Sequence, residues 1–150
     1  MDAVTYPNDK VAVYVDKNVI PLRIKHDQQP YAEQFKVKWT PRLFILDANG
    51  GSAHDTMGFL PPEELVPFIQ LGQAKEAFHS DCLDKAIDIL NPLLEESPAC
   101  SSAPEAVFLR GVCLYKKNDD PQALKEVYRR LTFDYPHSEW ARRGFPYWNL

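Results

Sequence analysis

The spacing of apolar residues near the start of the chain predicts one helix followed by one strand. After Asp9, which we expect to be the N-cap, apolar residues recur at every fourth position as Val11, Val15 and Val19, and this spacing places one apolar stripe on a helix. In the segment 20–25, apolar and polar residues alternate as they do in a strand. Pro21 cannot donate a hydrogen bond to a ladder, so it must begin this strand or lie on an edge.

A second helix and a β-hairpin are predicted next. The apolar positions between Tyr31 and Val37 favour a short helix. The run 43–46 is continuously apolar, which is typical of a strand buried on both faces. It stops at the segment 47–51, whose Asn and Gly residues tolerate the positive φ of a tight turn. We therefore expect a hairpin with a return strand over 53–59.

A longer helix should begin at Pro61 and Pro62, since proline is well suited to the first turn of a helix. Glu63 and Glu64 would lie favourably near its positive end. This helix leads almost directly into the second half of the chain. Pro67 and Gly72 are the expected points at which it bends or breaks.

The order of these elements between Asp2 and Leu71 resembles the thioredoxin-fold family. The shared features are Trp39, Thr40 and Pro41 at the entrance to a buried strand, a glycine turn, a short return strand and a final helix. The resemblance implies that the Thr40–Pro41 peptide bond is cis and that this loop lies beside a pair of redox cysteines. The backbone before the proline would then be free to pair with a substrate strand. Trp39, Thr40 and Pro41 are therefore interpreted as the remnant of a substrate-binding loop.

The chain departs from this family in two connected respects. Thiol-disulfide exchange needs a thiolate and a nearby resolving thiol, but the cysteines are Cys82, Cys100 and Cys113, all in the other half. Family members also place a strand and the cysteine pair before the segment that matches the start of this chain. That strand is the central one, between the segments 20–25 and 42–46. Its loss would leave unpaired strand edges, and we expect the chain to be a truncation of a longer protein.

The second half contains an internal repeat. An offset of 37 residues relates Ala74 to Gly111 and Ala86 to Ala123, and prolines follow both second helices at Pro98 and Pro136. Small residues allow two helix backbones to pack closely. Helical hairpins with this pattern resemble tetratricopeptide (TPR) repeats. A generic pair of helical hairpins with small residues by chance is the alternative.

The sequence thus predicts an incomplete thioredoxin-like α/β domain at 1–71, followed by a TPR-like helical-hairpin array at 72–150. Two repeats are fewer than a stable array usually needs, so a short capping helix is expected over 138–143. The aromatic tail after Arg143 is interpreted as a lid on the last hairpin, with a ligand site as the alternative.

Composition narrows the classes of partner. The net charge is -4 and no run of Lys or Arg exceeds two residues, which argues against nucleic acid. No segment has the ~20 apolar residues of a membrane span, and the first residues do not show the basic region followed by an apolar one that is typical of an export signal. Three irregularly spaced cysteines do not form a disulfide framework. We therefore expect a soluble protein of a reducing, cytoplasmic compartment.

Few residues suggest chemistry. The four histidines, which are His26, His54, His79 and His137, are scattered without other ligands at metal spacing, so we expect surface histidines, no metal and no cofactor. Cys113 should be a small core residue, whereas Cys82 and Cys100 lie in predicted turns. An exposed reactive thiol at either is the alternative to an inert one.

The resemblance to TPR proteins implies a concave groove lined by the first helix of each hairpin. By that register the peptide-binding candidates are Lys75, Phe78, His79, Phe108, Tyr115 and Lys116. Aromatic anchors would give affinity and lysines would orient acidic groups. Glu105 stands where carboxylate-gripping repeats have Lys, which weakens that version of the groove.

Two functions follow from these patterns. The first is a noncatalytic adaptor, in which a thioredoxin-like platform and two TPR-like hairpins bind a protein or peptide partner. The alternative is a fragment of a thiol-disulfide oxidoreductase whose CxxC motif lies upstream of Met1. A homodimer formed through the open sheet edge is a third expectation.

Overall fold

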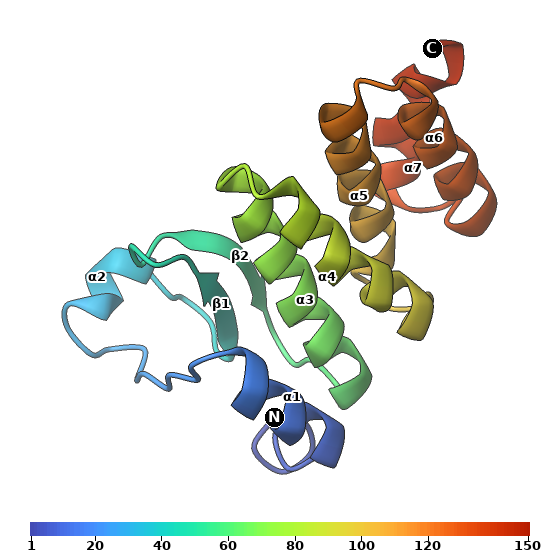
Figure 1. The fold of residues 1–150 in the computed structure, drawn as a ribbon. Helices are drawn as coiled ribbons and strands as arrows, with labels where there is room; N and C mark the ends of the chain where they lie inside the picture. Colours follow the sequence, from blue (N-terminus) through green and yellow to red (C-terminus); the bar gives the residue numbers. More distant parts are fainter. The chain divides into compact units, whose positions relative to one another are not determined.

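The computed structural model describes residues 1–150 and is mostly helical, with one two-stranded antiparallel sheet (Figure 1). The chain divides into two compact units, Met1–Val66 and Pro67–Leu150. The boundary expected from the sequence at residue 71 lies inside one helix, which contributes residues to both units. In chain order the elements are α1 (Asp9–Asn18), α2 (Tyr31–Phe35), β1 (Arg42–Leu46), β2 (Ser52–Met57), α3 (Pro62–His79), α4 (Leu83–Glu96), α5 (Ala103–Asn118), α6 (Gln122–Asp134), α7 (Glu139–Gly144) and the 3-10 helix η1 (Phe145–Asn149).

The first helix begins one residue earlier than predicted. Asn8 is its N-cap, because its extended backbone lets the side-chain oxygen accept hydrogen bonds from the N–H groups of Lys10 at 3.1 Å and Val11 at 3.3 Å. Asp9 is instead the first helical residue, where its charge favours the positive end of the helix. Of the predicted stripe, Val11 is buried and Val15 is half-buried, whereas Val19 lies just beyond the helix as its C-cap, so the stripe was predicted only in part.

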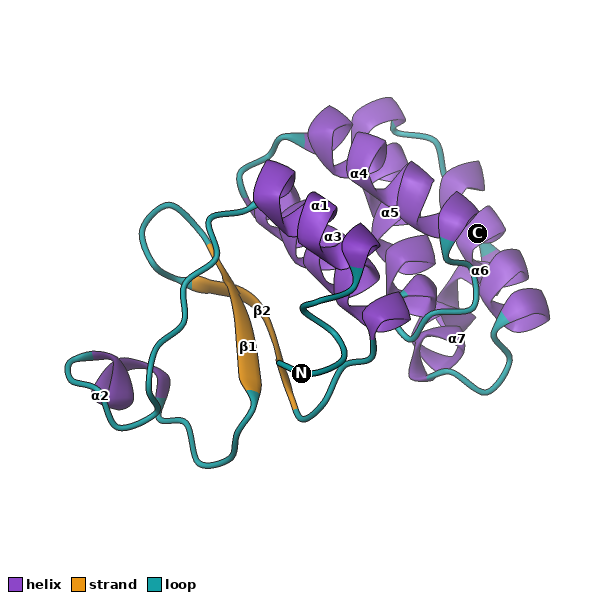
Figure 2. Ribbon diagram, turned by 90° about the horizontal axis from the view of Figure 1, so that it is seen from below, coloured by secondary structure: helices purple, strands orange, loops and turns teal.

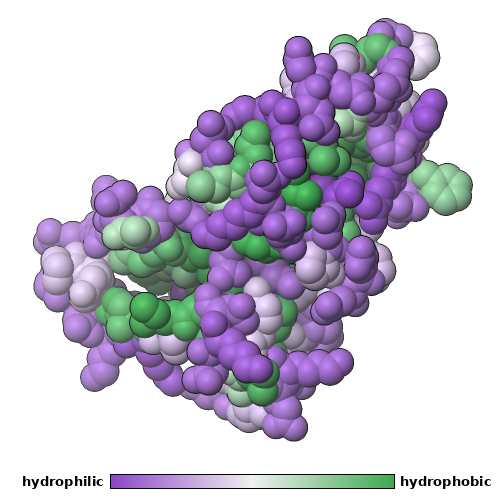
Figure 3. Space-filling model, in the orientation of Figure 1, coloured by the Kyte–Doolittle hydropathy of each residue, from purple (hydrophilic) through white to green (hydrophobic).

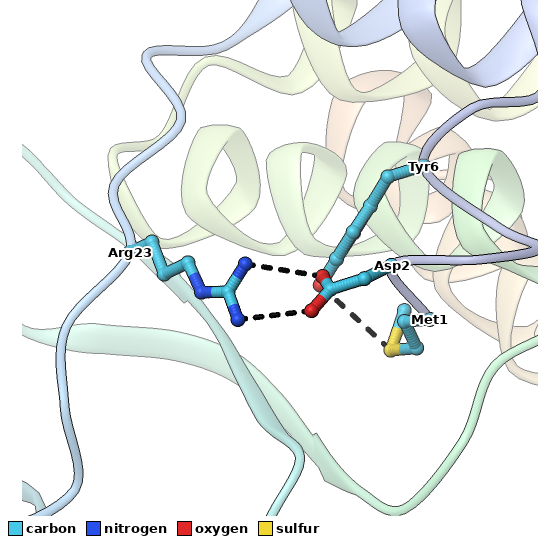
Figure 4. A network of polar contacts seen from close by, with 4 residues as sticks. All are labelled: Met1, Asp2, Tyr6 and Arg23. Carbon is cyan, nitrogen blue, oxygen red and sulfur yellow. Dashed lines mark hydrogen bonds and ion pairs between the residues drawn. The ribbon is translucent and has the colours of Figure 1, made fainter.

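The strand predicted over 20–25 does not form. Ile20 and Leu22 are 95% and 71% exposed, and β1 and β2 are the only strands. The prediction was wrong because a strand needs a neighbour to pair its backbone groups, and none lies beside this segment. It is tethered by Arg23, whose guanidinium donates to both carboxylate oxygens of Asp2 at 2.9 and 3.2 Å (Figure 4). This ion pair is exposed, so it holds the segment weakly.

A tyrosine lies next to this ion pair in Figure 4. The hydroxyl of Tyr6 donates to the Sδ of Met1 at 3.8 Å. Partial burial, followed by the negative charge of Asp2, raises the pKa of Tyr6, and Arg23 opposes the shift. In the same N-terminal turn, buried Thr5 donates its hydroxyl proton to the carbonyl of Leu60 at 2.6 Å. The start of the chain is thus tied to the residues that precede α3.

The predicted hairpin is confirmed, since β1 and β2 pair in antiparallel fashion. One carboxylate oxygen of Asp47 accepts hydrogen bonds from the N–H groups of Asn49 and Gly51, each at 2.8 Å, and Gly50 has φ +80°, which favours glycine. The expectation that β1 is buried on both faces is wrong: its central residues are half-buried and its ends are exposed. A two-stranded sheet offers each side chain too few neighbours for full burial.

Two predicted boundaries also change. Helix α3 is continuous from Pro62 to His79 and does not break at Pro67 or Gly72. Pro67 removes one intrahelical hydrogen bond, and the remaining ladder keeps the helix intact. Helix α2 ends at Phe35 because Lys36 adopts a left-handed conformation with φ 45°, which excludes Val37 from the helix.

In the second unit, α4 packs on α5 and α5 packs on α6 (Figure 2), and buried Ala77 of α3 belongs to the same cluster as Ala86 of α4. Ala74 and Ala86 are fully buried. A Cβ atom added at Gly111 would lie only 1.9 Å from the Cγ2 atom of Val127, so α5 and α6 approach too closely for any larger residue. The positions identified by the 37-residue offset are therefore sites of close helix packing.

The C-terminal residues cover the last hairpin. Helix α7 begins after Ser138, whose hydroxyl accepts a hydrogen bond from the N–H of Ala141 at 3.0 Å. The η1 helix then packs on α6 and α7. The predicted capping helix and lid are confirmed, with the helix at Glu139–Gly144 in place of 138–143. No helix anywhere in the chain combines the length and apolar character needed to cross a bilayer.

Candidate functional site

Some of the predicted groove residues come together at the end of α3. The Nζ atom of Lys116 lies 5.1 Å from the centroid of the Phe78 ring, in the range of a cation–π contact. His79 meets the same ring edge-on, with centroids 5.8 Å apart. Lys116 also pairs with Asp81 at 3.2 Å. The structure therefore gathers two of the predicted aromatic and basic side chains, from α3 and α5, around Phe78.

The base of this cluster is apolar. The half-buried Phe78 packs against Ala77, Ala86 and Cys113, which are all buried. His79 and Lys116 are exposed, and Tyr115, which precedes Lys116, is half-buried on α5. One side of the Phe78 ring is thus fixed by the core, and at the surface the ring is bordered by His79 and by Lys116, which is paired with Asp81. This arrangement can accept an apolar side chain together with a carboxylate.

Lys75 is not free to orient a ligand in the way the sequence suggested. Its Nζ atom forms an ion pair with the Glu105 carboxylate, which connects α3 to α5. The two side chains are only 20% and 21% exposed. The sequence has Glu105 at a position where carboxylate-binding repeats have Lys. The structure gives a physical reason for the glutamate, because its carboxylate neutralises Lys75.

Phe108 is also separated from the Phe78 cluster, since the chain's own tail covers it. Its ring centroid lies 5.0 Å from that of Trp140 and 5.7 Å from that of Tyr147. The guanidinium of Arg143 lies 4.5 Å from the centroid of the Trp140 ring. Burial raises the pKa of Tyr147. Of the six groove candidates, Lys75 and Phe108 therefore serve internal packing, and His79 and Lys116 contact Phe78.

The loop of Trp39, Thr40 and Pro41 lies in the first unit. Trp39 is 68% exposed, and the Thr40–Pro41 peptide bond is cis, as the resemblance implied. A cavity of about 220 Å³ is lined here by His26, Val37, Lys38, Trp39 and Thr40. His26 and Lys38 were not identified as site residues from the sequence. Lys38 is adjacent to Trp39 in the chain, but only the return of the loop brings His26 to the cavity.

The three cysteine thiols differ in accessibility. Cys82 is exposed at the N-cap of α4, whereas Cys100 and Cys113 are buried. Burial, opposed in part by the charge of Lys116, raises the pKa of Cys113 from 9.0 to about 11. The expectation of a core role for Cys113 is confirmed. Cys100 follows a turn as predicted, but its burial leaves Cys82 as the accessible thiol.

A second cavity, of about 80 Å³, was not foreseen from the sequence. It is lined by Asn91, Leu94, Glu95, Arg110 and Arg130. The Nε of Arg110 donates to the Oδ1 of Asn91 at 2.6 Å, and Arg130 pairs with Asp134 at 3.5 Å. The guanidinium groups of both arginines in this cavity are thus already engaged by oxygen acceptors.

Of the four histidines, only His54, on β2, is half-buried, so the expectation of a surface position was wrong for that residue.

The chain matches no protein-family model, no curated protein and no solved structure. What its two units can bind therefore has to follow from their own side chains.

Proposed function

We propose that this chain is a noncatalytic protein-interaction module, in which a thioredoxin-like unit is joined to TPR-like helical hairpins. In this proposal the helical unit binds an extended or helical segment of a partner protein. The observation that carries it is the convergence of Lys116 on the ring of Phe78, with a distance of 5.1 Å from Nζ to the centroid. Aromatic anchors beside cations are typical of peptide-binding surfaces.

The cluster supports a ligand with an apolar side chain and a neighbouring carboxylate. The apolar group would contact the exposed part of Phe78, whose opposite side is supported by buried Ala77 and Cys113. The carboxylate would pair with Lys116, in competition with Asp81 at 3.2 Å. Because that Asp81 side chain is 81% exposed, displacing it costs little. In this proposal His79, whose ring centroid lies 5.8 Å from that of Phe78, adds a hydrogen bond.

The same cluster limits the size of the groove. Lys75 is neutralised by Glu105, and Phe108 is covered by Trp140 and Tyr147. The binding surface in this proposal is therefore centred on Phe78, His79, Tyr115 and Lys116. A short segment of partner is sufficient to occupy it.

A peptide-display experiment tests this function. Random dodecapeptides on phage are selected against the full chain, and one selected peptide is titrated by calorimetry. We expect the selected peptides to share an apolar residue next to Asp or Glu. The variant Lys116→Glu should weaken binding about tenfold, because it replaces attraction by repulsion.

The neighbouring lysine provides a matched control. Lys117 lies on the same helix and also pairs with an exposed aspartate, Asp84, but its ammonium group is not over Phe78. Lys117→Glu should change the affinity by less than about twofold. Equal losses in both variants would indicate nonspecific charge attraction, and the absence of any selected peptide would count against the proposal.

A second candidate is that the first unit belongs to a thiol-disulfide oxidoreductase. The cavity that Trp39 and Thr40 share with His26 and Lys38 favours it, since the resemblance assigns substrate binding to this loop. Reading the coding DNA upstream in frame tests this candidate. A strand pattern followed by a cysteine pair would support it, and a stop codon before any such pair would remove it. Under both candidates, residues 1–150 should not reduce insulin.

A further inference from the structure

The outer edge of β1 carries unpaired backbone groups. The carbonyl of Pro41 accepts from the N–H of Gly58 at 2.8 Å before β1, and the N–H of Asp47 donates to the carbonyl of Gly51 at 2.8 Å after it. The register shift between Ile45 and Leu46 adds its extra residue on β2, so odd-numbered positions of β1 face β2. Neighbouring residues alternate in an antiparallel ladder. The N–H and C=O groups of Arg42, Phe44 and Leu46 therefore point away from β2, where no further strand lies (Figure 2). Such an edge is a template for another strand.

These three outward positions are self-complementary. If a second copy pairs with β1 around a two-fold axis at Phe44, then Phe44 meets its own equivalent and Arg42 meets Leu46 of the other copy. Every position that faces outward is then opposite another that faces outward, so each free N–H meets a free C=O. The geometry points to an antiparallel β1–β1 contact between two copies of this chain.

The charges along the strand favour the same orientation. Lys38 and Arg42 lie at its beginning, and Asp47 follows its end. Antiparallel pairing brings the basic beginning of one copy toward the acidic end of the other. Parallel pairing would bring like charges together, which is unfavourable. Arg42 also pairs with Asp55 inside the hairpin, with Nε to Oδ2 at 3.0 Å, so Lys38 and Asp47 carry most of this preference.

The surroundings of the edge are apolar and open. In the space-filling view, apolar surface borders a hollow at the left, where Figure 1 places α2 and β1 (Figure 3). Ile20, Leu22 and Trp39 expose most of their side-chain surface in this unit. Pairing would convert a two-stranded sheet, which is marginal by itself, into a four-stranded one. Because a five-residue strand offers a small contact, the dimer should be weak and concentration-dependent.

Sedimentation velocity over a wide concentration range, combined with residue-resolved amide exchange, tests this dimer. The mass should rise toward that of two copies as concentration increases. The amides of Arg42, Phe44 and Leu46 should become protected only at high concentration. The amides at positions 43 and 45, which face β2, should be protected at every concentration. A constant monomer mass, or edge amides that exchange equally fast at all concentrations, would overturn the proposal.

A pair of substitutions at Leu46 separates edge pairing from general stickiness. Leu46 is 40% exposed, so both variants should fold, which circular dichroism would verify. Leu46→Lys places like charges opposite Arg42 at two equivalent positions and should weaken the dimer about tenfold. Leu46→Glu places an opposite charge there and should leave the dimer as strong or stronger. If both variants weaken the dimer equally, then position 46 does not lie opposite Arg42 of the other copy. The two copies would then be held together by apolar contact alone, and the proposed register would be wrong.

Discussion

Gly111 and Val127 are in such close contact that a single added carbon atom at position 111 would lie 1.9 Å from the Cγ2 of Val127. This contact sets the distance between α5 and α6. In the preceding hairpin, the position that corresponds to Gly111 is Ala74, which is fully buried. The same small-residue requirement thus recurs once per hairpin, and it is strictest at Gly111.

Replacing Gly111 by alanine should therefore destabilise the chain. Alanine is the better helix former by about 1 kcal/mol, but the overlap with Val127 should cost more than this gain. We expect a net loss of about 1 to 2 kcal/mol in the free energy of unfolding, measured by urea denaturation. In the Gly111→Ala background, Val127→Ala should cost much less than it does in the unchanged chain. Additive effects of the two substitutions would contradict a direct clash.

Breaking the ion pair between Lys75 and Glu105 should cost more than breaking a surface pair. Both side chains are about four-fifths buried, being 20% and 21% exposed. Lys75→Met leaves the Glu105 carboxylate without this partner, and the free energy of unfolding should fall by about 1 to 3 kcal/mol. The double variant Lys75→Met with Glu105→Leu should recover most of the loss. Lys117→Met, which breaks an exposed pair with Asp84, is the control and should cost under about 0.5 kcal/mol.

The raised pKa of Cys113 predicts a loss of stability at alkaline pH. The folded state holds this thiol protonated up to about pH 11, whereas the ordinary value is 9.0. The unfolded chain therefore releases the proton first, so this contribution is complete below about pH 9 and is lost as pH rises toward 11. Urea unfolding between about pH 8 and pH 10.5 should show a steeper decline for the unchanged chain than for Cys113→Ala. Parallel declines would exclude this titration as the cause.

The same burial predicts selective thiol labelling. Exposed Cys82 should react rapidly with a disulfide reagent, while buried Cys100 and Cys113 should react only as the chain unfolds. Spectrophotometric counting should give one fast thiol in buffer and three in denaturant. Cys82→Ser should remove the fast phase completely. A fast phase that survives this substitution would show that one of the buried thiols is accessible.

The two neighbouring aromatic residues of the tail should differ in importance. Tyr147 is half-buried and stacks on Phe108 at 5.7 Å, whereas Trp148 is 56% exposed. Tyr147→Ala should lower the free energy of unfolding by about 1 to 3 kcal/mol, since it removes the stack and its buried area. Trp148→Ala should cost under about 0.5 kcal/mol. Similar losses of stability in the two variants would mean that the tail stabilises the fold through the size of its side chains and not through the specific contact between Tyr147 and Phe108.

Local patterns predicted the local structure well. The valine spacing gave α1, the apolar run followed by Asp47, Asn49 and Gly50 gave the hairpin, and the 37-residue offset gave the positions of close helix packing. These signals depend on neighbours a few residues away, or on a repeated unit. The predicted start of α1 was wrong by one residue, since Asp9 was predicted as the N-cap and Asn8 is the N-cap in the structure. Two adjacent residues were equally suitable as caps.

The sequence failed where the outcome depends on a distant partner. Alternating residues in 20–25 satisfy the pattern of a strand, yet no neighbouring strand is present to pair with them. Lys75 and Phe108 have the character of groove residues, but Glu105 and the tail engage them. Of the six groove candidates, the structure leaves the Phe78 and Lys116 contact as the centre of the proposed site.

The sequence by itself determined which segments are helical, where the hairpin turns and which positions must be small, because those properties follow from local backbone preferences and from periodicity. Only the tertiary structure decided which side chains remain available for a partner. Burial and ion pairing depend on residues that are far apart in the chain, as Lys75 and Glu105 are, and no local pattern encodes their meeting. For the same reason, only the folded hairpin shows that the edge groups of Arg42, Phe44 and Leu46 are left unpaired.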